Sequence, residues 1–313
     1  MSVYTTLNKN ELKPLADRLQ LSQINSLDGI SAGVVNTNYK VTTNSGQYVL
    51  TMVEDPDEAD ALPFIASLLT YLAKKGIPCP RPVTDEDGNN HFILKNRPTL
   101  IASFLTGSSP SQPLAGHCYE IGKMLANIHL AGGDYKPNRT NPMGRIKWAT
   151  LLEKTGPILK KTAPETLELL LDEAEWLEDN YHGLELPAGL CHGDLFPDNS
   201  LFTDGRLTGV IDFFFACNEL YIYDLAVARN AWCFDDTGES VPGNWQKLCE
   251  GYEKIRPLST AEKQQLTAAA RAAALRFSLS RLFDNHFPRS GETVTKKDPQ
   301  LFIKRLRYFR QLT

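Results

Sequence analysis

Three polar side chains fall close together in the sequence in a pattern that suits phosphoryl chemistry. Asp194 and Asn199 lie within the segment His-Gly-Asp-Leu-Phe-Pro-Asp-Asn, and Asp212 follows the apolar pair Val210-Ile211. Transfer of a phosphoryl group from a nucleotide needs an acidic side chain that accepts or orients the proton of the acceptor hydroxyl. It also needs an amide oxygen and a second carboxylate to hold the metal ion that neutralises the phosphates. The three residues therefore form a candidate base-and-metal constellation.

The residues around this constellation favour its assembly in one site. Leu190-Cys191 is typical of a short buried strand, and Asp204-Gly205 is a two-residue hairpin signal between two strand-like runs. Such a hairpin would return Asp212 to the neighbourhood of Asn199, so that both could reach one metal ion. The alternative is a surface loop that contains Asp, Pro and Asn because turns favour these residues. That alternative leaves the strand and hairpin signals unexplained.

Composition and charge narrow the class of protein. The chain has 313 residues, of which 42% are hydrophobic and 22% charged, and its formal net charge is −4. No basic cluster indicates a nucleic-acid partner, the longest apolar stretch is too short and interrupted to span a membrane, and no signal-peptide pattern opens the chain. We therefore expect a cytoplasmic protein that binds neither nucleic acid nor a membrane, and these features leave open whether it is a monomer or a homodimer.

The six cysteines point to packing rather than to metal binding or disulfides. None of them belongs to a C-x-x-C pair, and their spacing suggests no zinc site. We expect reduced thiols that are mostly buried.

The order of expected elements divides the chain into two lobes. Residues 8–11 resemble a helix capping box, and the region from Tyr39 to Leu105 alternates strand signals, turns and one helix over residues 58–75. Helical periodicity dominates after the boundary at residues 106–110. We therefore predict an α+β fold, with a small antiparallel-sheet lobe at residues 1–105 and a larger, mainly helical lobe at residues 106–313.

Several motifs resemble those of a known group of enzymes. The loop matches the protein-kinase catalytic loop at His192, Asp194, Leu195 and Asn199, with Gly193 in place of arginine. Further motifs of the resemblance are Asn36–Tyr39, Tyr48–Thr51, Pro78–Pro82, His129–Gly132, Gly209–Phe213 and Tyr223–Ala226. Together they are similar to the aminoglycoside phosphotransferase and choline kinase superfamily, a branch of the protein-kinase-like fold. Within it the chain looks like the type II homoserine kinases.

The resemblance implies an activity and a set of cofactors. The reaction would be ATP-dependent phosphorylation of the L-homoserine hydroxyl to O-phospho-L-homoserine, for threonine biosynthesis. Asp194 would be the catalytic base, while Asn199 and Asp212 would hold Mg²⁺. The residues implied in binding ATP, in a turn over the phosphates and in a linker beside the adenine, are Ser31, Ala32, Gly33, Val34, Asn36, Thr37, Asn38, Ser103, Phe104 and Leu105.

An amino-acid acceptor needs one partner for its carboxylate and another for its ammonium group. Arg229 is a candidate for the carboxylate, because a guanidinium binds a carboxylate bidentately, and Asn230 and Trp232 would line the same pocket. His129 and Asp224 are further candidates, although such a histidine is more often packed and an Asp in a first helical turn usually complements the helix dipole. Candidates without motif support are Arg276, Arg281 and residues 284–286.

One position departs from the kinase pattern. Kinases of this fold usually carry a Lys or Arg on the third strand, paired with an acid on a helix, but Thr51 stands where the cation is expected. The candidates for a replacing cation are Lys40 and Lys95, and those for the acid are Asp57, Glu58 and Asp60.

Two other functions are compatible with the sequence. The chain could be another small-molecule kinase of the same fold, acting on choline, an aminoglycoside or a sugar-like alcohol. It could also be a catalytically silent nucleotide-binding protein. The missing strand cation slightly favours the silent protein, whereas Asp194, Asn199 and Asp212 argue against it.

Overall fold

The structure is a computed structural model that describes residues 5–30, 36–288 and 298–312. Contacts divide the chain into two compact units, which are described separately. One unit comprises the chain up to Thr106 together with Gly209–Phe214, and the other comprises Gly107–Thr208 with most of the remaining C-terminal part. Among the described residues, no helix combines the length and the hydrophobicity that a membrane span requires.

The first unit is built on a five-stranded antiparallel sheet. The strands are β1 (Ile24–Gly29), β2 (Thr37–Thr43), β3 (Gly46–Met52), β4 (Phe92–Leu94) and β5 (Arg97–Ser103). Their spatial order is β1-β2-β3-β5-β4. Helix α1 (Lys9–Arg18) precedes the sheet, and α2 (Pro56–Ala59) and α3 (Leu62–Lys74) lie between β3 and β4 in the chain.

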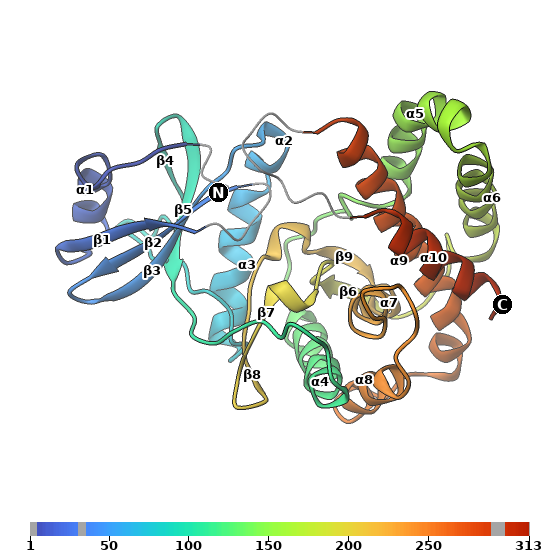
Figure 1. Cartoon of the computed structure of the whole chain (residues 1–313). Coiled ribbons are helices and arrows are strands. Elements are labelled where there is room, and N and C mark those ends of the chain that lie inside the picture. Colours follow the sequence, from blue (N-terminus) through green and yellow to red (C-terminus); the bar gives the residue numbers. More distant parts are fainter. Residues whose placement is uncertain (1–4, 31–35, 289–297, 313) are drawn as a thin grey trace. The chain divides into compact units, whose positions relative to one another are not determined.

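Helix α1 and the sheet share one hydrophobic core. Residues at every second position of β2, such as Tyr39 and Val41, pack in the same buried cluster as Leu12 of α1. The helix begins with the capping box predicted from the sequence, in which Asn8 and Glu11 each accept a hydrogen bond from the backbone N–H of the other. Figure 1 shows α1 beside the sheet, and α3 contacts β5.

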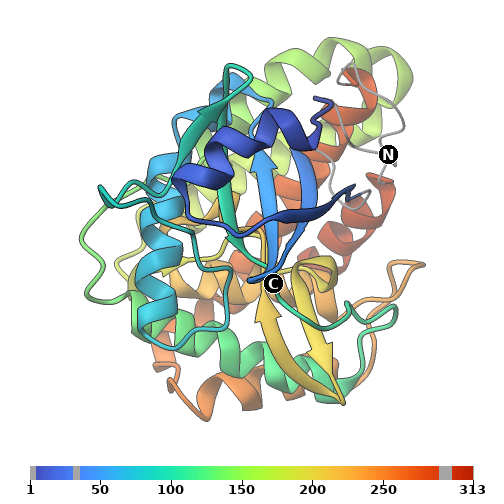
Figure 2. The same cartoon turned by 90° about the vertical axis from the view of Figure 1, so that its left-hand side faces the viewer.

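The second unit is mainly helical. Its helices are α4 (Ala115–Gly132), α5 (Arg145–Thr162), α6 (Pro164–Asn180), α7 (Tyr221–Trp232), α8 (Asn244–Glu253), α9 (Thr260–His286) and α10 (Gln300–Arg310). Strand β6 (Ala188–Cys191) pairs with β9 (Cys217–Leu220), and β7 (Ser200–Thr203) pairs with β8 (Arg206–Val210). Figure 2 shows β7 and β8 as two adjacent yellow arrows. The last residues of β8 belong to the first unit.

Helices α4 and α8 approach closely because each presents a glycine to the other. A Cβ atom on Gly122 would lie 2.1 Å from the carbonyl oxygen of Leu248, and one on Gly251 would lie 2.0 Å from that of Tyr119. Backbone therefore packs directly against backbone at both points. This approach brings Tyr252, next to Gly251, within hydrogen-bonding distance of His129 on α4.

The predicted α+β fold is confirmed, and the differences concern particular elements. The single helix expected over residues 58–75 is two helices, because Pro63 lies in the first turn of α3 and so marks a helix start. Strands β1 and β9 were not predicted. The edge strand β1 has no regular alternation of buried and exposed residues, so it lacks the periodic signal on which such predictions depend.

Candidate active site

The candidate catalytic loop, residues 192–199, begins directly after β6 and is held by a buried carboxylate. Asp224, in the first turn of α7, accepts the backbone N–H of His192 through Oδ2 and that of Gly193 through Oδ1, both at 2.8 Å. Gly193 has a φ of 76°, and a Cβ atom there would lie 2.6 Å from the carbonyl oxygen of Phe215. The loop therefore needs glycine at this position and an acceptor at position 224.

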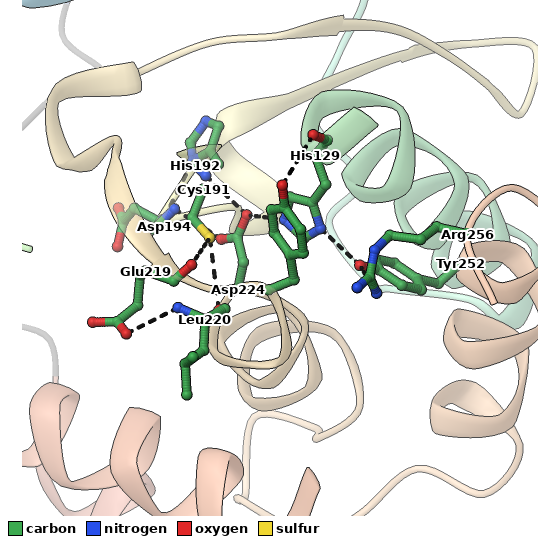
Figure 3. A network of polar contacts seen from close by, with 11 residues as sticks. His129, Cys191, His192, Asp194, Glu219, Leu220, Asp224, Tyr252 and Arg256 are labelled. Carbon is green, nitrogen blue, oxygen red and sulfur yellow. Dashed lines mark hydrogen bonds and ion pairs between the residues drawn. The ribbon is translucent and has the colours of Figure 1, made fainter. Parts of the chain in front are cut away.

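Asp224 is itself part of a buried polar network (Figure 3). Nε2 of His129 lies 3.0 Å from Asp224 Oδ2, and Nδ1 of His129 lies 2.8 Å from the hydroxyl of Tyr252, which accepts from Arg256 at 3.1 Å. Burial alone would raise the pKa of Asp224. This effect is outweighed by the hydrogen bond and charge of His129, to which His192 and Gly193 add smaller contributions. The pKa of Asp224 therefore lies below its usual range. The network thus fixes an ionised carboxylate under the loop.

Replacing Asp224 with Asn should destabilise the protein by about 2–5 kcal/mol at neutral pH, because the buried cluster loses its negative charge and one of its two acceptor oxygens. Since the pKa of Asp224 is lowered on folding, its ionised form stabilises the fold at neutral pH. This contribution is lost as the pH falls through the lowered pKa. Urea unfolding of both proteins at several pH values would measure the effect. The stability difference should shrink below about pH 4, and a constant difference would contradict this account.

The same cluster does not have the properties of a metal centre. Ligand atoms of His129, Cys191 and Asp224 lie within 4.8 Å of one another. Burial raises the pKa of the Cys191 thiol, which donates to the backbone carbonyls of Glu219 and Leu220 at 3.6 and 3.7 Å. A protonated thiol is a poor metal ligand. All six cysteines are free, and five of them are buried.

Asp194 and Asn199 lie together in the loop. The side-chain nitrogen of Asn199 donates to the backbone carbonyl of Asp194 at 2.8 Å and lies 3.3 Å from its Oδ2 atom. These bonds orient the amide so that its oxygen accepts no hydrogen bond from the described residues. The structure thus brings together two of the three residues in the predicted constellation.

Arg276 of α9 holds the loop from the other side. One guanidinium nitrogen donates to the carbonyl of Gly193, and another lies 3.4 Å from Oδ1 of Asp194. The side chain is only 3% exposed, and its guanidinium lies over the ring of Phe277 at 4.2 Å. A buried cation favours the ionised form of a carboxylate beside it. The sequence offered no motif for this role, because Arg276 is 82 residues from Asp194.

Asp212 lies two residues beyond the end of β8 and belongs to the first unit, whereas Asp194 and Asn199 belong to the second. The N–H of Val210 donates to the carbonyl of Pro78 at 2.8 Å, which anchors the strand that leads to Asp212. The φ of Asp212 is 62°, in the left-handed region that few residues other than glycine adopt. Such backbone strain is often retained at functional sites.

Part of the predicted nucleotide site falls within the described residues. Ser31, Ala32, Gly33 and Val34 lie outside them. The side chain of Asn36 accepts a hydrogen bond from the N–H of Glu54, and the hydroxyl of Thr37 donates to the Glu54 carboxylate at 2.6 Å. The side chain of Asn38 accepts a hydrogen bond from the hydroxyl of Thr51 at 2.7 Å. The start of β2 is therefore tied to β3 and to the residues that follow it.

The predicted adenine linker continues directly from β5. Ser103 accepts the N–H of Arg81 through its hydroxyl at 2.9 Å, and the N–H of Phe104 donates to the carbonyl of Gln47 at 3.0 Å. Leu105 follows, half-buried.

Both candidates for the cation missing at Thr51 have partners within the first unit. Lys95 forms an ion pair with Glu11 of α1 at 2.8 Å, and Lys40 lies 4.5 Å over the ring of Phe104. Among the candidate acids, Glu58 accepts from the side chain of Asn36 at 3.3 Å, and Asp60 is exposed. For Asp57 the structure describes no side chain.

The predicted acceptor residues of α7 are buried in packing. The guanidinium of Arg229 lies over the rings of Trp245 and Phe309 at 4.4 and 4.8 Å, and burial lowers its pKa. Asn230 donates to backbone carbonyls of α7 and α9. Trp232 donates to the carbonyl of Leu195 at 2.8 Å and thereby supports the candidate catalytic loop.

A loop with an Asp and an Asn five residues apart, beside a mainly helical core and following an antiparallel-sheet unit, defines a kinase of the protein-kinase-like class. The sequence comparison agrees, and the chain belongs to the phosphotransferase enzyme family, whose pattern matches residues 26–258. It is 40% identical over 308 residues to a homoserine kinase of Xanthobacter autotrophicus, covering 98% of this chain and 96% of that protein. It is 39% identical to a homoserine kinase of Rhodospirillum rubrum, covering 100% of this chain and 97% of that protein.

Solved structures show the same fold at much lower identity. The amicoumacin kinase hAmiN, in complex with AMP-PNP, Ca²⁺ and Ami, superimposes with a TM-score of 0.74 at 14% identity, covering 98% of both chains. Choline kinase from Cryptosporidium parvum gives a TM-score of 0.68 at 14% identity, covering 97% of this chain and 95% of that one. These structures confirm the protein-kinase-like fold, whereas membership of the phosphotransferase family rests on the sequence comparison.

Proposed function

We propose that this protein transfers the γ-phosphoryl group of ATP to the side-chain hydroxyl of L-homoserine, giving O-phospho-L-homoserine and ADP for threonine biosynthesis. The observation that carries the proposal is 39–40% identity to homoserine kinases along nearly the whole of both chains. The similarity covers the catalytic loop and the C-terminal helices as well as the sheet.

In this proposal Asp194 is the catalytic base. Its carboxylate accepts the proton of the homoserine hydroxyl as the oxygen attacks the γ-phosphorus, which requires an ionised and positioned side chain. Two contacts support this role, since Asn199 fixes the loop at Asp194 and Arg276 places a buried positive charge beside it.

Asn199 and Asp212 would hold a magnesium ion. Mg²⁺ prefers oxygen ligands, and the donor set consists of a carboxylate and an amide oxygen that accepts no hydrogen bond from the described residues. When bound, the metal would neutralise the β- and γ-phosphates of ATP. The segment from Ser31 to Asn38 would cover the phosphates, and residues 103–105 would present backbone groups to the adenine.

An assay of ADP release with a panel of acceptors tests the proposal. We expect turnover with L-homoserine well above that with choline, ethanolamine or kanamycin, and a phosphorus NMR signal for the O-phospho product. Turnover of another alcohol without turnover of homoserine would replace the proposed substrate. ATP binding without ADP release for any acceptor would favour the catalytically silent alternative.

A further inference from the structure

Three arginines surround an aromatic cluster that begins in the catalytic loop. The ring of Phe196 in the loop lies 4.8 Å from that of Phe277, which lies 4.9 Å from that of Phe302 on α10. The guanidinium of Arg276 lies 4.2 Å from the ring centroid of Phe277. Those of Arg281 and Arg305 lie 4.2 and 4.5 Å from the ring centroid of Phe302. Positive charge is thus concentrated beside the loop that carries Asp194.

Two of these arginines already have buried partners. Arg276 donates to the carbonyl of Gly193 and contacts Asp194. Arg305 donates to the carbonyl of Asn230 at 2.6 Å, near the C-terminus of α7. Both are less than 9% exposed. Their guanidinium groups therefore form hydrogen bonds within the protein.

Arg281 differs from them. It is only partly buried, and its one hydrogen bond among the described residues is a donation to the backbone carbonyl of Asp298 at 3.3 Å. Within the same residues it forms no ion pair. Burial lowers the pKa of Arg281 to about 10, and among the opposing charges that of Asp194 is the strongest. The side chain is therefore cationic at neutral pH, partly desolvated, and within the electrostatic reach of the catalytic carboxylate.

The size of the acceptor limits where its carboxylate can bind. Four covalent bonds separate the hydroxyl oxygen of homoserine from its carboxylate carbon, a span of roughly 5 Å. If the hydroxyl is hydrogen-bonded to Asp194, the carboxylate partner must lie near the loop. Arg281 is five residues beyond Arg276 on α9, or about 7.5 Å further along the helix axis. Arg229 is enclosed by Trp245 and Phe309, and burial lowers its pKa, with Asp194 not among its main electrostatic neighbours.

We propose that Arg281 binds the carboxylate of the acceptor amino acid while Asp194 accepts the proton of its hydroxyl. The inference rests on the proposed homoserine kinase function and deepens it by naming an acceptor-binding residue. The guanidinium of Arg281 is held over an aromatic ring and has no carboxylate partner among the residues that the structure describes. Such a fork suits bidentate recognition of an incoming carboxylate.

The test compares two acceptors with the same enzymes. L-Homoserine carries the carboxylate, and 3-aminopropan-1-ol is the same molecule without it. For Arg281→Gln we expect kcat/KM to fall on the order of 10²-fold with homoserine but less than about threefold with 3-aminopropan-1-ol. Arg281→Lys should lie between, because the ammonium keeps the charge and loses the fork. Arg307→Gln, which changes an exposed arginine of α10, is the matched control and should behave as the unchanged enzyme.

The two acceptors separate carboxylate binding from other effects. Removing positive charge near Asp194, or disturbing the fold, would reduce turnover of both acceptors by the same factor, and that result would overturn the assignment. An undiminished kcat/KM with homoserine would overturn it too. If the unchanged enzyme does not phosphorylate homoserine but does phosphorylate another alcohol, the proposed function fails first, and the assignment of Arg281 fails with it.

Discussion

Replacing Asp194 with asparagine is expected to lower kcat by a factor of roughly 10² to 10⁴ while the affinity for ATP is largely kept. Asparagine has nearly the same shape and can keep the contact with Asn199, but its amide cannot accept the proton of the acceptor hydroxyl. Steady-state kinetics would give kcat, and calorimetric titration with ATP would show whether binding survives.

Asp198→Asn is a matched control for this experiment. Asp198 is in the same loop, four residues further on, and is exposed, whereas Asp194 is partly buried beside Arg276. We expect its kcat to stay within a few-fold of the unchanged enzyme. A large loss in Asp198→Asn together with normal turnover in Asp194→Asn would reverse the assignment of the base.

Replacing Asp212 with asparagine should chiefly weaken magnesium-dependent nucleotide binding, on the order of 10²-fold, because the metal loses an anionic ligand. Asparagine tolerates the left-handed backbone conformation at this position, so the change removes charge without adding strain. Titrations with ATP in the presence and absence of Mg²⁺ would measure the effect.

Asp204→Asn controls for the backbone conformation. Asp204 also has a positive φ, 51°, but lies exposed in the turn between β7 and β8. Its substitution should leave the magnesium dependence unchanged. If Asp212→Asn binds ATP with the same dependence on Mg²⁺ as the unchanged enzyme, Asp212 is not a metal ligand.

The sequence predicted best what depends on neighbouring residues. The capping box at Asn8, the Asp204-Gly205 hairpin and the strand before His192 are local signals, and the structure contains all three elements. The candidate catalytic loop could be predicted for the same reason, since its residues fall within eight consecutive positions.

What the sequence could not predict are contacts between distant parts of the chain. His129 and Asp224 are 95 residues apart and Arg276 and Asp194 are 82 apart, and no spacing rule connects them. Arg229 was predicted to bind the carboxylate because a guanidinium can do so bidentately. A one-dimensional pattern could not show that Trp245 and Phe309 cover its guanidinium.

Gly122 of α4 and Gly251 of α8 affect how tolerance to substitution should be interpreted in this enzyme. Neither Gly122 nor Gly251 carries chemistry, yet a single added methyl group at either would collide with the backbone of the other helix. The collision would move Tyr252 relative to His129, two contacts away from the loop. Ranked only by intolerance to change, these glycines would stand beside Asp194. Intolerance there records the distance between two helices, and it carries no information about which alcohol is phosphorylated.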